Sequence, residues 1–229
     1  MDSSLIILTL NEIEGVSVIY KNIPFSEINE ILVIDGGSSD GTVEFFTSKG
    51  IKLVSQKRKG RGEAFRLARN EAKGDCLVFF SPDGNEDPKD IPTLISKIKG
   101  GYDIAIGSRF AKGGHNEEDE VLLPWRAWAN RLFTFLANLL WNRGRYVTDT
   151  INGFRAITKE AFDKIKIDAP GFVIEYQMSI RAMKLNLKTV EIPTWEGNRI
   201  GGESTAKSIP TGILFVKFLL RELFIGNNF

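Results

Sequence analysis

The sequence predicts an α/β protein with a mainly parallel central sheet flanked by helices. Short apolar runs recur along its first half, and each is continuous rather than alternating, as expected of strands buried on both faces. Stretches with apolar residues at helical spacing separate these runs. Because strand and helix alternate repeatedly, the strands are expected to pair in parallel through right-handed crossovers. With 229 residues, the chain is long enough for one such domain with a full core.

Five strands are expected in order along the chain, each bounded by polar or glycine-rich residues. A helix is expected after the third, where GRGEAFRLARNEAKGD places Ala64, Phe65 and Ala68 on one face. The single cysteine, Cys76, opens the fourth strand and is expected to fill the core, since it has no partner for an intrachain disulfide. The strands are LIILTL (5–10), EILVID (30–35), IKLVS (51–55), CLVFF (76–80) and YDIAIG (102–107).

Polar residues follow each of these strands. In such sheets ligands bind beyond the carboxyl ends of the strands. Any one of these segments alone could be an ordinary turn, because Gly, Asp, Asn and Ser favour turns. Five in succession at the strand ends predict a site for a small polar ligand. Neither a Rossmann glycine fingerprint nor a P-loop is present. The segments are TLNE (9–12), DGGSSDGT (35–42), QKRKGRG (56–62), SPDGNED (81–87) and GSRF (107–110).

Two of these segments carry acids with an expected role. Asp35, at the end of its strand, is expected to accept hydrogen bonds from a base or a ribose. Asp83, Glu86 and Asp87 crowd at the end of the fourth strand, and like charges repel unless something positive lies between them. This acidic segment is therefore either a solvated loop or the face of a metal or cationic site.

The order of these motifs resembles the inverting family 2 glycosyltransferases of the GT-A fold, a Rossmann-like domain. Within them it is most similar to the dolichyl-phosphate mannose synthase and polyprenyl-phosphate hexose transferase branch. The resemblance covers about residues 4 to 210, and no single motif carries it alone. Beyond the strand ends it rests on DTINGFRAITKEAF (149–162), GFVIEYQMSIRAMKLNLKTVEIP (171–193) and RIGGESTAK (199–207).

The resemblance implies a single glycosyltransferase domain over residues 1–229. Its parts would be a nucleotide-sugar-binding half (1–110), an acceptor half (111–207) and an amphipathic C-terminal helix (208–229). The implied reaction moves a mannose- or glucose-like hexose from a GDP- or UDP-linked sugar to a polyprenyl or dolichyl phosphate, with inversion. Two alternatives stay open, a related transferase acting on a soluble saccharide or other hydroxyl acceptor, and a non-catalytic nucleotide-sugar-binding subunit.

A divalent cation, Mg²⁺ or Mn²⁺, is implied as cofactor. Asp83 and Asn85 stand where the family has its D-x-D motif, which holds the metal against the diphosphate. The second carboxylate is missing here, and Asn85 supplies an oxygen ligand without charge. Glu86 or Asp87 is an alternative ligand.

The resemblance also assigns roles to further residues. Asp149, Arg109 and Asp83 would be catalytic. A lipid phosphate is already an anion, so Asp149 would orient it rather than remove a proton. Arg199 and Lys207 would close over the phosphates as a lid. The implied substrate-binding residues are Thr9, Asn11, Glu12, Asp35, Gly60, Arg61, Asp83, Gly84, Arg109, Arg155, Arg199 and Lys207.

Two tracts rich in Leu, Phe and Trp, residues 124–149 and 210–229, raise the question of a membrane. Their interspersed arginines and lysines favour helices lying at a bilayer surface, with core helices as the alternative. No run is apolar enough to span a bilayer and no leader peptide is evident, so a place at the cytoplasmic face is expected. A separate membrane-anchoring subunit is a further alternative. The net charge of +1 argues against nucleic acid as a partner.

Two polar features are expected to be solvated loop. His115 has no second histidine or cysteine near it in the sequence for a zinc site. The run EEDE (117–120) is typical of an exposed charged segment.

Overall fold

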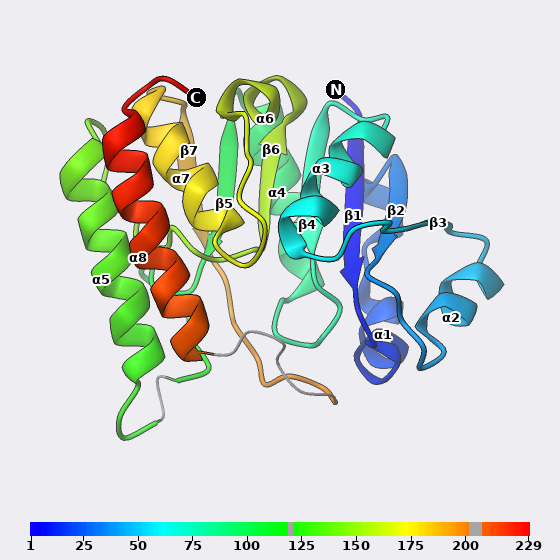
Figure 1. Ribbon diagram of the computed structural model, residues 1–229. Helices are drawn as coiled ribbons and strands as arrows, with labels where there is room; N and C mark the ends of the chain where they lie inside the picture. The colour runs from blue at the N-terminus through cyan, green and yellow to red at the C-terminus, as the bar shows by residue number, and fades with distance from the viewer. Residues whose placement is uncertain (119–120, 202–207) are drawn as a thin grey trace.

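The structure, a computed structural model, describes residues 1–118, 121–201 and 208–229. Within these ranges the strands form one seven-stranded sheet in the order β3-β2-β1-β4-β6-β5-β7, which runs through the middle of the molecule (Figure 1). The expected α/β fold with a mainly parallel sheet is confirmed. The strands are β1 (Ser3–Thr9), β2 (Glu30–Asp35), β3 (Lys52–Ser55), β4 (Cys76–Phe80), β5 (Ile104–Ser108), β6 (Arg155–Thr158) and β7 (Thr189–Pro193).

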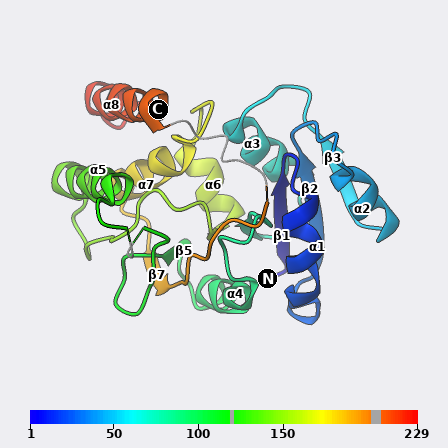
Figure 2. The same ribbon diagram turned by 90° about the horizontal axis from the view of Figure 1, so that it is seen from below.

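Helices cover both faces of the sheet, as the view onto one edge shows (Figure 2). One face carries α1 (Ile13–Ile19), α2 (Thr42–Ser48) and α4 (Ile91–Lys99). The opposite face carries α3 (Arg61–Glu71), α6 (Lys159–Ile165) and α7 (Ile174–Lys184). Outside α7, two long helices, α5 (Trp125–Trp141) and α8 (Ser208–Ile225), lie side by side (Figures 1 and 2).

The core consists of two apolar layers, one on each side of the sheet. Alternate residues of a strand point to opposite faces, so Ile6 of β1 belongs to one layer and Ile7 to the other. Phe65 of α3 stacks on Phe79 of β4 with ring centroids 4.0 Å apart, which docks this helix on the sheet. Burying one such side chain contributes about 1.5–3 kcal/mol.

Cys76 is fully buried as expected, and burial raises the pKa of its thiol to about 12.

Strand β6 runs against its neighbours, which the sequence reasoning did not anticipate. It pairs antiparallel with both β4 and β5, and Ala156 lies opposite Val78 on one side and Ala105 on the other. The segment that leads into β6 therefore arrives at the edge where the parallel strands end. This reversal brings residues 149–154 to the carboxyl edge of the sheet.

The two long helices lie in the two apolar tracts, as expected. Helix α5 ends at Trp141 because Asn142 adopts an extended backbone, so the rest of the apolar tract continues as a loop. Helix α8 begins at Ser208 and ends at Ile225. In the part of the chain that the structure describes, no helix is long and apolar enough to cross a membrane.

Candidate functional site

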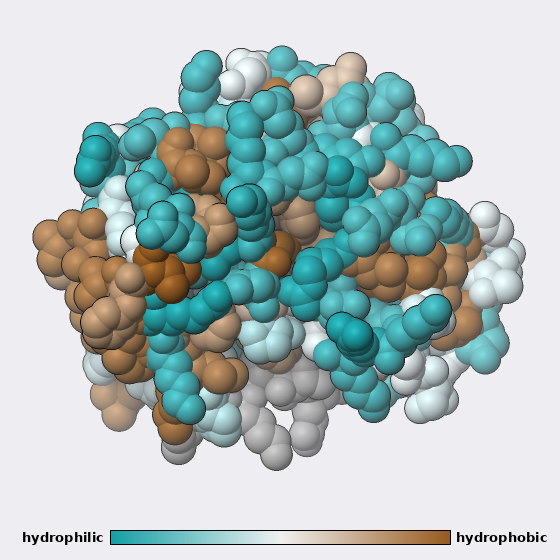
Figure 3. Space-filling model, turned by 45° about the horizontal axis from the view of Figure 1, so that its top comes forward, coloured by the Kyte–Doolittle hydropathy of each residue, from teal (hydrophilic) through white to brown (hydrophobic). Residues whose placement is uncertain are grey.

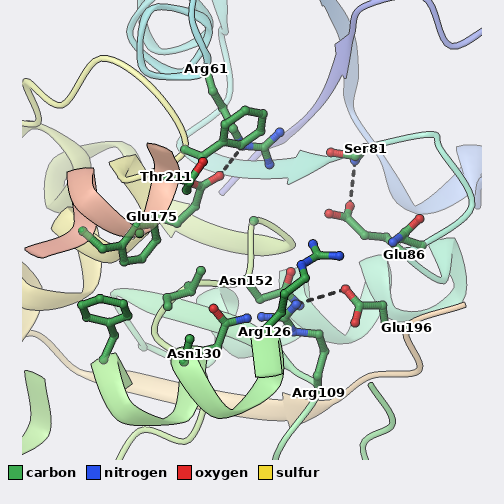
Figure 4. A pocket seen from close by; sticks show the side chains of 18 of the residues that line it. Arg61, Ser81, Glu86, Arg109, Arg126, Asn130, Asn152, Glu175, Glu196 and Thr211 are labelled. Atoms are coloured by element: carbon green, nitrogen blue, oxygen red, sulfur yellow. Dashed lines mark hydrogen bonds and ion pairs between the residues drawn. The ribbon is translucent and has the colours of Figure 1, made fainter. Parts of the chain in front are cut away.

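A cavity of about 290 Å³ opens at the carboxyl edge of the sheet (Figure 4). One end is lined by charged and polar side chains, many of them from the strand ends, and the other by apolar side chains, mainly from α5 and α8. Arg126, Asn130 and Thr211 add polar groups from these two helices. The charged and polar residues are Arg61, Ser81, Asp83, Asn85, Glu86, Arg109, Arg126, Asn130, Asn152, Glu175, Thr194, Glu196 and Thr211. The others are Trp125, Ala129, Phe133, Ile151, Gly153, Phe172, Gly212 and Phe215.

Arg109 and Asp149 form a buried ion pair at the charged end. Arg109 follows β5, and its Nε and Nη2 donate to the two oxygens of Asp149 at 2.7 and 3.1 Å. Its Nη1 donates to Glu196 at 3.1 Å. Burial alone would raise the pKa of Asp149, but the charge and hydrogen bonds of Arg109 outweigh it and hold that pKa below its ordinary value. Asp149 is therefore an ionised group suited to orienting Arg109.

The loop that carries Asp149 is fixed by hydrogen bonds at its backbone. The amide of Asp149 donates to Glu191 of β7 at 2.8 Å, and the Asp149 carboxylate accepts from the amide of Asn152 at 3.0 Å. Asn152 also donates to the carbonyl of Gly107 at 2.6 Å. These bonds hold the entry to β6 against β5 and β7, so Asp149 and Arg109 meet in one geometry.

The acidic segment after β4 enters the same cavity. Asp83 accepts from the amide of Asn85 at 3.2 Å and from Arg199 Nη1 at 2.7 Å. Gly84 has a φ of +94°, and a Cβ there would approach Ile200 to 2.6 Å, so glycine lets the turn pack against the chain after β7. Glu86 accepts from the amide of Ser81 at 2.7 Å. Burial, and then the charge of Asp83, raise the pKa of Glu86 well above its ordinary value.

The oxygens of this segment fit a divalent cation. Asn85 Oδ1 is buried and has no hydrogen-bond partner among the described residues, while Nδ2 of the same side chain donates to Glu117 at 3.3 Å. An unpaired amide oxygen beside the Asp83 carboxylate is a ligand set that hard cations accept. The described residues contain no group of three or more acidic, histidine or cysteine side chains that could hold a metal. A cation there would complete its coordination with oxygens from a substrate or from water.

Thr9, Asn11 and Asp35 lie at the ends of β1 and β2, outside the residues that line the cavity. Asp35 accepts from Thr9 at 3.3 Å and from the amide of Gly37 at 2.9 Å. Asn11 accepts from the amide of Ser39 at 2.9 Å, which ties the two strand ends together. The carboxylate that was expected to read a base or ribose is thus engaged by its own turn.

Arg199 connects this region to the cavity. Its two terminal nitrogens donate to Asp83 at 2.7 Å and to Glu12 at 2.5 Å. Burial raises the pKa of Glu12 despite the opposing effect of Arg199. The structure therefore brings Glu12, Asp83 and Arg199 together, and Asp35 lies apart from Asp83 and Arg109. Lys207, the other expected lid residue, lies outside the described residues.

Arg61 begins α3 and pairs with Glu175 of α7. Gly60 precedes it with a φ of +124°, and a Cβ at Gly60 would come within 2.6 Å of the carbonyl of Pro170. Glycine thus lets the chain turn tightly into the helix and point Arg61 at the cavity.

Arg155 does not reach the cavity. It is fully buried, and its guanidinium donates to the carbonyls of Asn152 and Glu175 and to Ser179. Burial lowers its pKa to about 10. The resemblance implies that Arg155 contacts a substrate, and this geometry does not support that role. Arg155 instead stabilises the wall of the cavity through its hydrogen bonds to Asn152, Glu175 and Ser179.

Sequence reasoning missed several residues of the site and misread part of the loop between β5 and α5. Glu117 and Glu118 are partly buried and pair with Arg126 of α5, so the expectation of a solvated run is wrong for them. His115 stacks on Trp195 with ring centroids 3.9 Å apart. No sequence signal marked Glu175, Glu196 or Phe215, because only the tertiary fold brings them to the strand ends.

Comparisons with known proteins agree with this architecture. The family model described as Glycosyl transferase family 2 matches residues 4–166. The chain is 33% identical over 215 residues to a dolichol-phosphate mannosyltransferase of Pyrococcus furiosus, covering 90% of this chain and 60% of that protein. It is 30% identical over 198 residues to glycosyltransferase AglJ of Haloferax volcanii, covering 86% and 63%. The chain thus spans about three fifths of the length of these curated relatives.

A bacterial relative and a solved structure extend the comparison. An undecaprenyl-phosphate mannosyltransferase of Micrococcus luteus is 28% identical over 215 residues, covering 87% of this chain and 85% of that one. Glucosyl-3-phosphoglycerate synthase of Mycobacterium tuberculosis, solved with Mn²⁺, UDP and glucosyl-3-phosphoglycerate, matches with a TM-score of 0.75 at 19% identity, covering 99% of this chain and 79% of that one. This likeness supports the GT-A fold. Because the family model spans more than half of the residues, the chain belongs to glycosyl transferase family 2.

Proposed function

We propose that this protein transfers a hexose from a nucleotide-diphosphate sugar to a polyprenyl phosphate, with inversion at the sugar. The observation that carries the proposal is the division of the cavity into a charged end at the strand termini and an apolar end between α5 and α8. A polyprenyl phosphate has the same division, an anionic head on a hydrocarbon chain. A purely polar saccharide would leave the apolar wall against water, which is unfavourable.

The names of the relatives support this substrate class. Two of them are a dolichol-phosphate and an undecaprenyl-phosphate mannosyltransferase, and both cover more than four fifths of this chain. The solved neighbour binds UDP with Mn²⁺. GDP and UDP therefore both belong in a test of the donor.

Asp83 and Asn85 would hold the divalent cation. When bound, it would neutralise the charge that develops on the departing diphosphate. The chain's own contribution is to orient and bind. Arg109 is fixed by Asp149 and Glu196 in the cavity wall, so this group of charges is oriented before the substrates bind.

Asp149 is poorly suited to act as a general base. Its two oxygens are engaged by Arg109, and its pKa is held below the ordinary value, so it has little tendency to take up a proton. An acceptor hydroxyl would need such a base, whereas an acceptor phosphate already carries its nucleophilic charge. The pairing of Asp149 thus removes the residue that the resemblance offered as a base for a hydroxyl acceptor.

The direct test is a transfer assay with a panel of GDP- and UDP-linked hexoses, Mg²⁺ or Mn²⁺, and a dispersed polyprenyl phosphate. We expect a glycolipid product whose anomeric configuration is opposite to that of the donor. Transfer to free saccharides but not to the lipid phosphate would contradict the proposal. Binding of nucleotide sugars without turnover of any acceptor would favour the non-catalytic alternative.

The outer surfaces of α5 and α8 support peripheral contact with a membrane. Apolar side chains gather at the left of the molecule in Figure 3, over these helices. Lys217 lies exposed on α8 and would meet anionic headgroups. The exposed apolar side chains include Trp128, Leu132, Phe135, Leu139, Leu220, Leu223 and Phe224.

Vesicle flotation tests this contact. The Leu139→Glu and Leu223→Glu variants each place a charge on the exposed surface, and we expect them to float less with anionic vesicles than the unaltered chain. Val18→Glu, on exposed α1 away from these helices, is the matched control and should float normally. Equal flotation of all four proteins would rule out this surface.

A further inference from the structure

Arg61 and Arg109 line the same cavity but differ in how their guanidinium groups are paired. Arg109 uses Nε, Nη1 and Nη2 on Asp149 and Glu196. Arg61 donates to Glu175 through Nε alone. Within the residues that the structure describes, no hydrogen bond engages its two terminal nitrogens. Arg61 therefore presents the edge of the guanidinium that pairs with two oxygens of an anion.

The Arg61 side chain is held in place by its surroundings. Its guanidinium carbon lies 5.5 Å from the ring centre of Phe65 and 6.0 Å from that of Phe172. A Cβ added at Gly153 would overlap the terminal nitrogen of Arg61, so glycine provides the space that this nitrogen occupies. The side chain is only 19% exposed. Little conformational entropy remains to be lost when an anion binds.

Arg126, the third arginine of the cavity, is a contrasting case. Its side chain is 46% exposed and lies 3.4 Å from Glu117 and 3.7 Å from Glu118. Two partners and contact with water weaken its attraction for a further anion.

The position of Arg61 is at the boundary between the two ends of the cavity. Figure 4 shows it near Thr211 of α8 and Glu175, across the cavity from Arg109. Phe172 and Phe215 continue the wall on the apolar side. An anion at Arg61 would have its attached hydrocarbon directed along this wall.

We infer that Arg61 binds the phosphate of the lipid acceptor, through the two terminal nitrogens that Glu175 leaves open. This assignment rests on the proposed function and names the residue that selects a phosphate-bearing lipid over the neutral alcohol. Glu175 is then a positioning residue, since it fixes the orientation of Arg61 without touching the lipid.

Calorimetric titration with geranyl phosphate and with geraniol, the same tail without the phosphate, tests the inference. Removing Arg61 alone would leave the Glu175 carboxylate buried and unpaired, so two neutral-carboxamide backgrounds are compared. Glu175→Gln keeps the guanidinium, and the double variant Arg61→Gln with Glu175→Gln lacks it. We expect geranyl phosphate to bind the double variant about 10- to 100-fold more weakly than Glu175→Gln. Geraniol should bind both equally, and thermal unfolding should show both folded.

The other outcomes separate the two proposals. Equal affinity of both variants for geranyl phosphate would overturn the role of Arg61 and leave the proposed function intact. A loss confined to a nucleotide-diphosphate sugar with Mg²⁺ would overturn the assignment to the acceptor, because Arg61 would then serve the donor. Failure of the unaltered chain to bind geranyl phosphate would overturn both.

Discussion

Two buried groups of charges lie on either side of α7, and they differ in how completely their members are paired. Between α7 and α8, the fully buried Glu222 accepts from Arg181 at 2.9 and 3.1 Å and from Lys184 at 2.8 Å. Burial would raise the pKa of Glu222, but these hydrogen bonds outweigh it and lower that pKa. In the cavity, by contrast, Asn85 Oδ1 and the terminal nitrogens of Arg61 have no partners among the described residues.

The completeness of pairing distinguishes buried charges that stabilise the fold from buried groups that can bind a ligand. A buried charge that is fully paired keeps two helices together and has nothing left to offer a ligand. A buried group with an open donor or acceptor carries a desolvation cost that a ligand can relieve. The four changes that follow test this distinction, from the largest expected effect to the smallest.

Glu222→Gln should destabilise the fold most. It removes the carboxylate that Arg181 and Lys184 share and leaves Arg181 with Asp168 at 3.2 Å. Breaking a buried group of charges costs about 3–5 kcal/mol of the free energy of unfolding. Urea unfolding followed by circular dichroism measures it. Glu160→Gln, which breaks the exposed pair with Lys164, is the control and should change nothing measurable. A Glu222 variant as stable as the control would show that the buried group does not hold α8.

Asp83→Asn should act on catalysis and leave the fold intact. Loss of the charged cation ligand is expected to lower kcat/KM for glycosyl transfer by about 10²- to 10³-fold. The urea midpoint should fall far less than for Glu222→Gln, because Arg199 keeps its pair with Glu12. Asp87→Asn is the matched control, since Asp87 caps the turn after β4 through the amide of Lys89 and does not line the cavity. If Asp87→Asn were the damaging change, the cation would belong to that carboxylate instead.

Gly153→Ala should weaken acceptor binding. The added methyl group would push Arg61 away from its place beside Glu175. We expect KM for the lipid phosphate to rise roughly tenfold, equivalent to about 1.4 kcal/mol, with KM for the nucleotide sugar unchanged. Gly144→Ala, in the exposed loop after α5, should leave both constants alone. A rise in the donor KM alone would place Arg61 on the other substrate.

Glu86→Gln should change the pH dependence of stability. Because the pKa of Glu86 is raised in the folded protein, the folded state binds this proton more tightly than the unfolded state does. Stability is therefore lost as the pH rises from about 4.5, the ordinary value, towards the folded pKa. The glutamine variant lacks this loss, so its melting temperature should fall less between pH 4.5 and 7. Parallel profiles would mean that Glu86 is an ordinary carboxylate.

The strands in the first half of the fold could be predicted from the sequence because each has a local signal. Continuous apolar runs end in polar turns, and the expected bounds of β2 and β4 agree with the structure. The reversal of β6 was not readable, since a four-residue strand has the same composition in either direction. Only the pairing partners on each side determine which way it runs.

The residues of the candidate site also include some that could be predicted from the sequence and some that could not. Asp83, Asn85 and Arg109 follow strands, so the rule that ligands bind at strand ends placed them correctly at one cavity. Asp35 also follows a strand, but the sequence does not show that its own turn would occupy its carboxylate. Glu175 and Phe215 lie within helices, and their role depends on where those helices pack. A local pattern contains no information about that packing.

Because β6 runs antiparallel to β4 and β5, its pairing with them also fixes where the preceding residues, 149–154, lie along the carboxyl edge of the sheet. Each residue of strand spans about 3.3 Å, so a slip of two residues in the pairing of β6 would shift the start of the strand by about 7 Å while its side chains kept their faces. The position of the Asp149 loop relative to Arg109 thus depends on which residues pair across two short ladders.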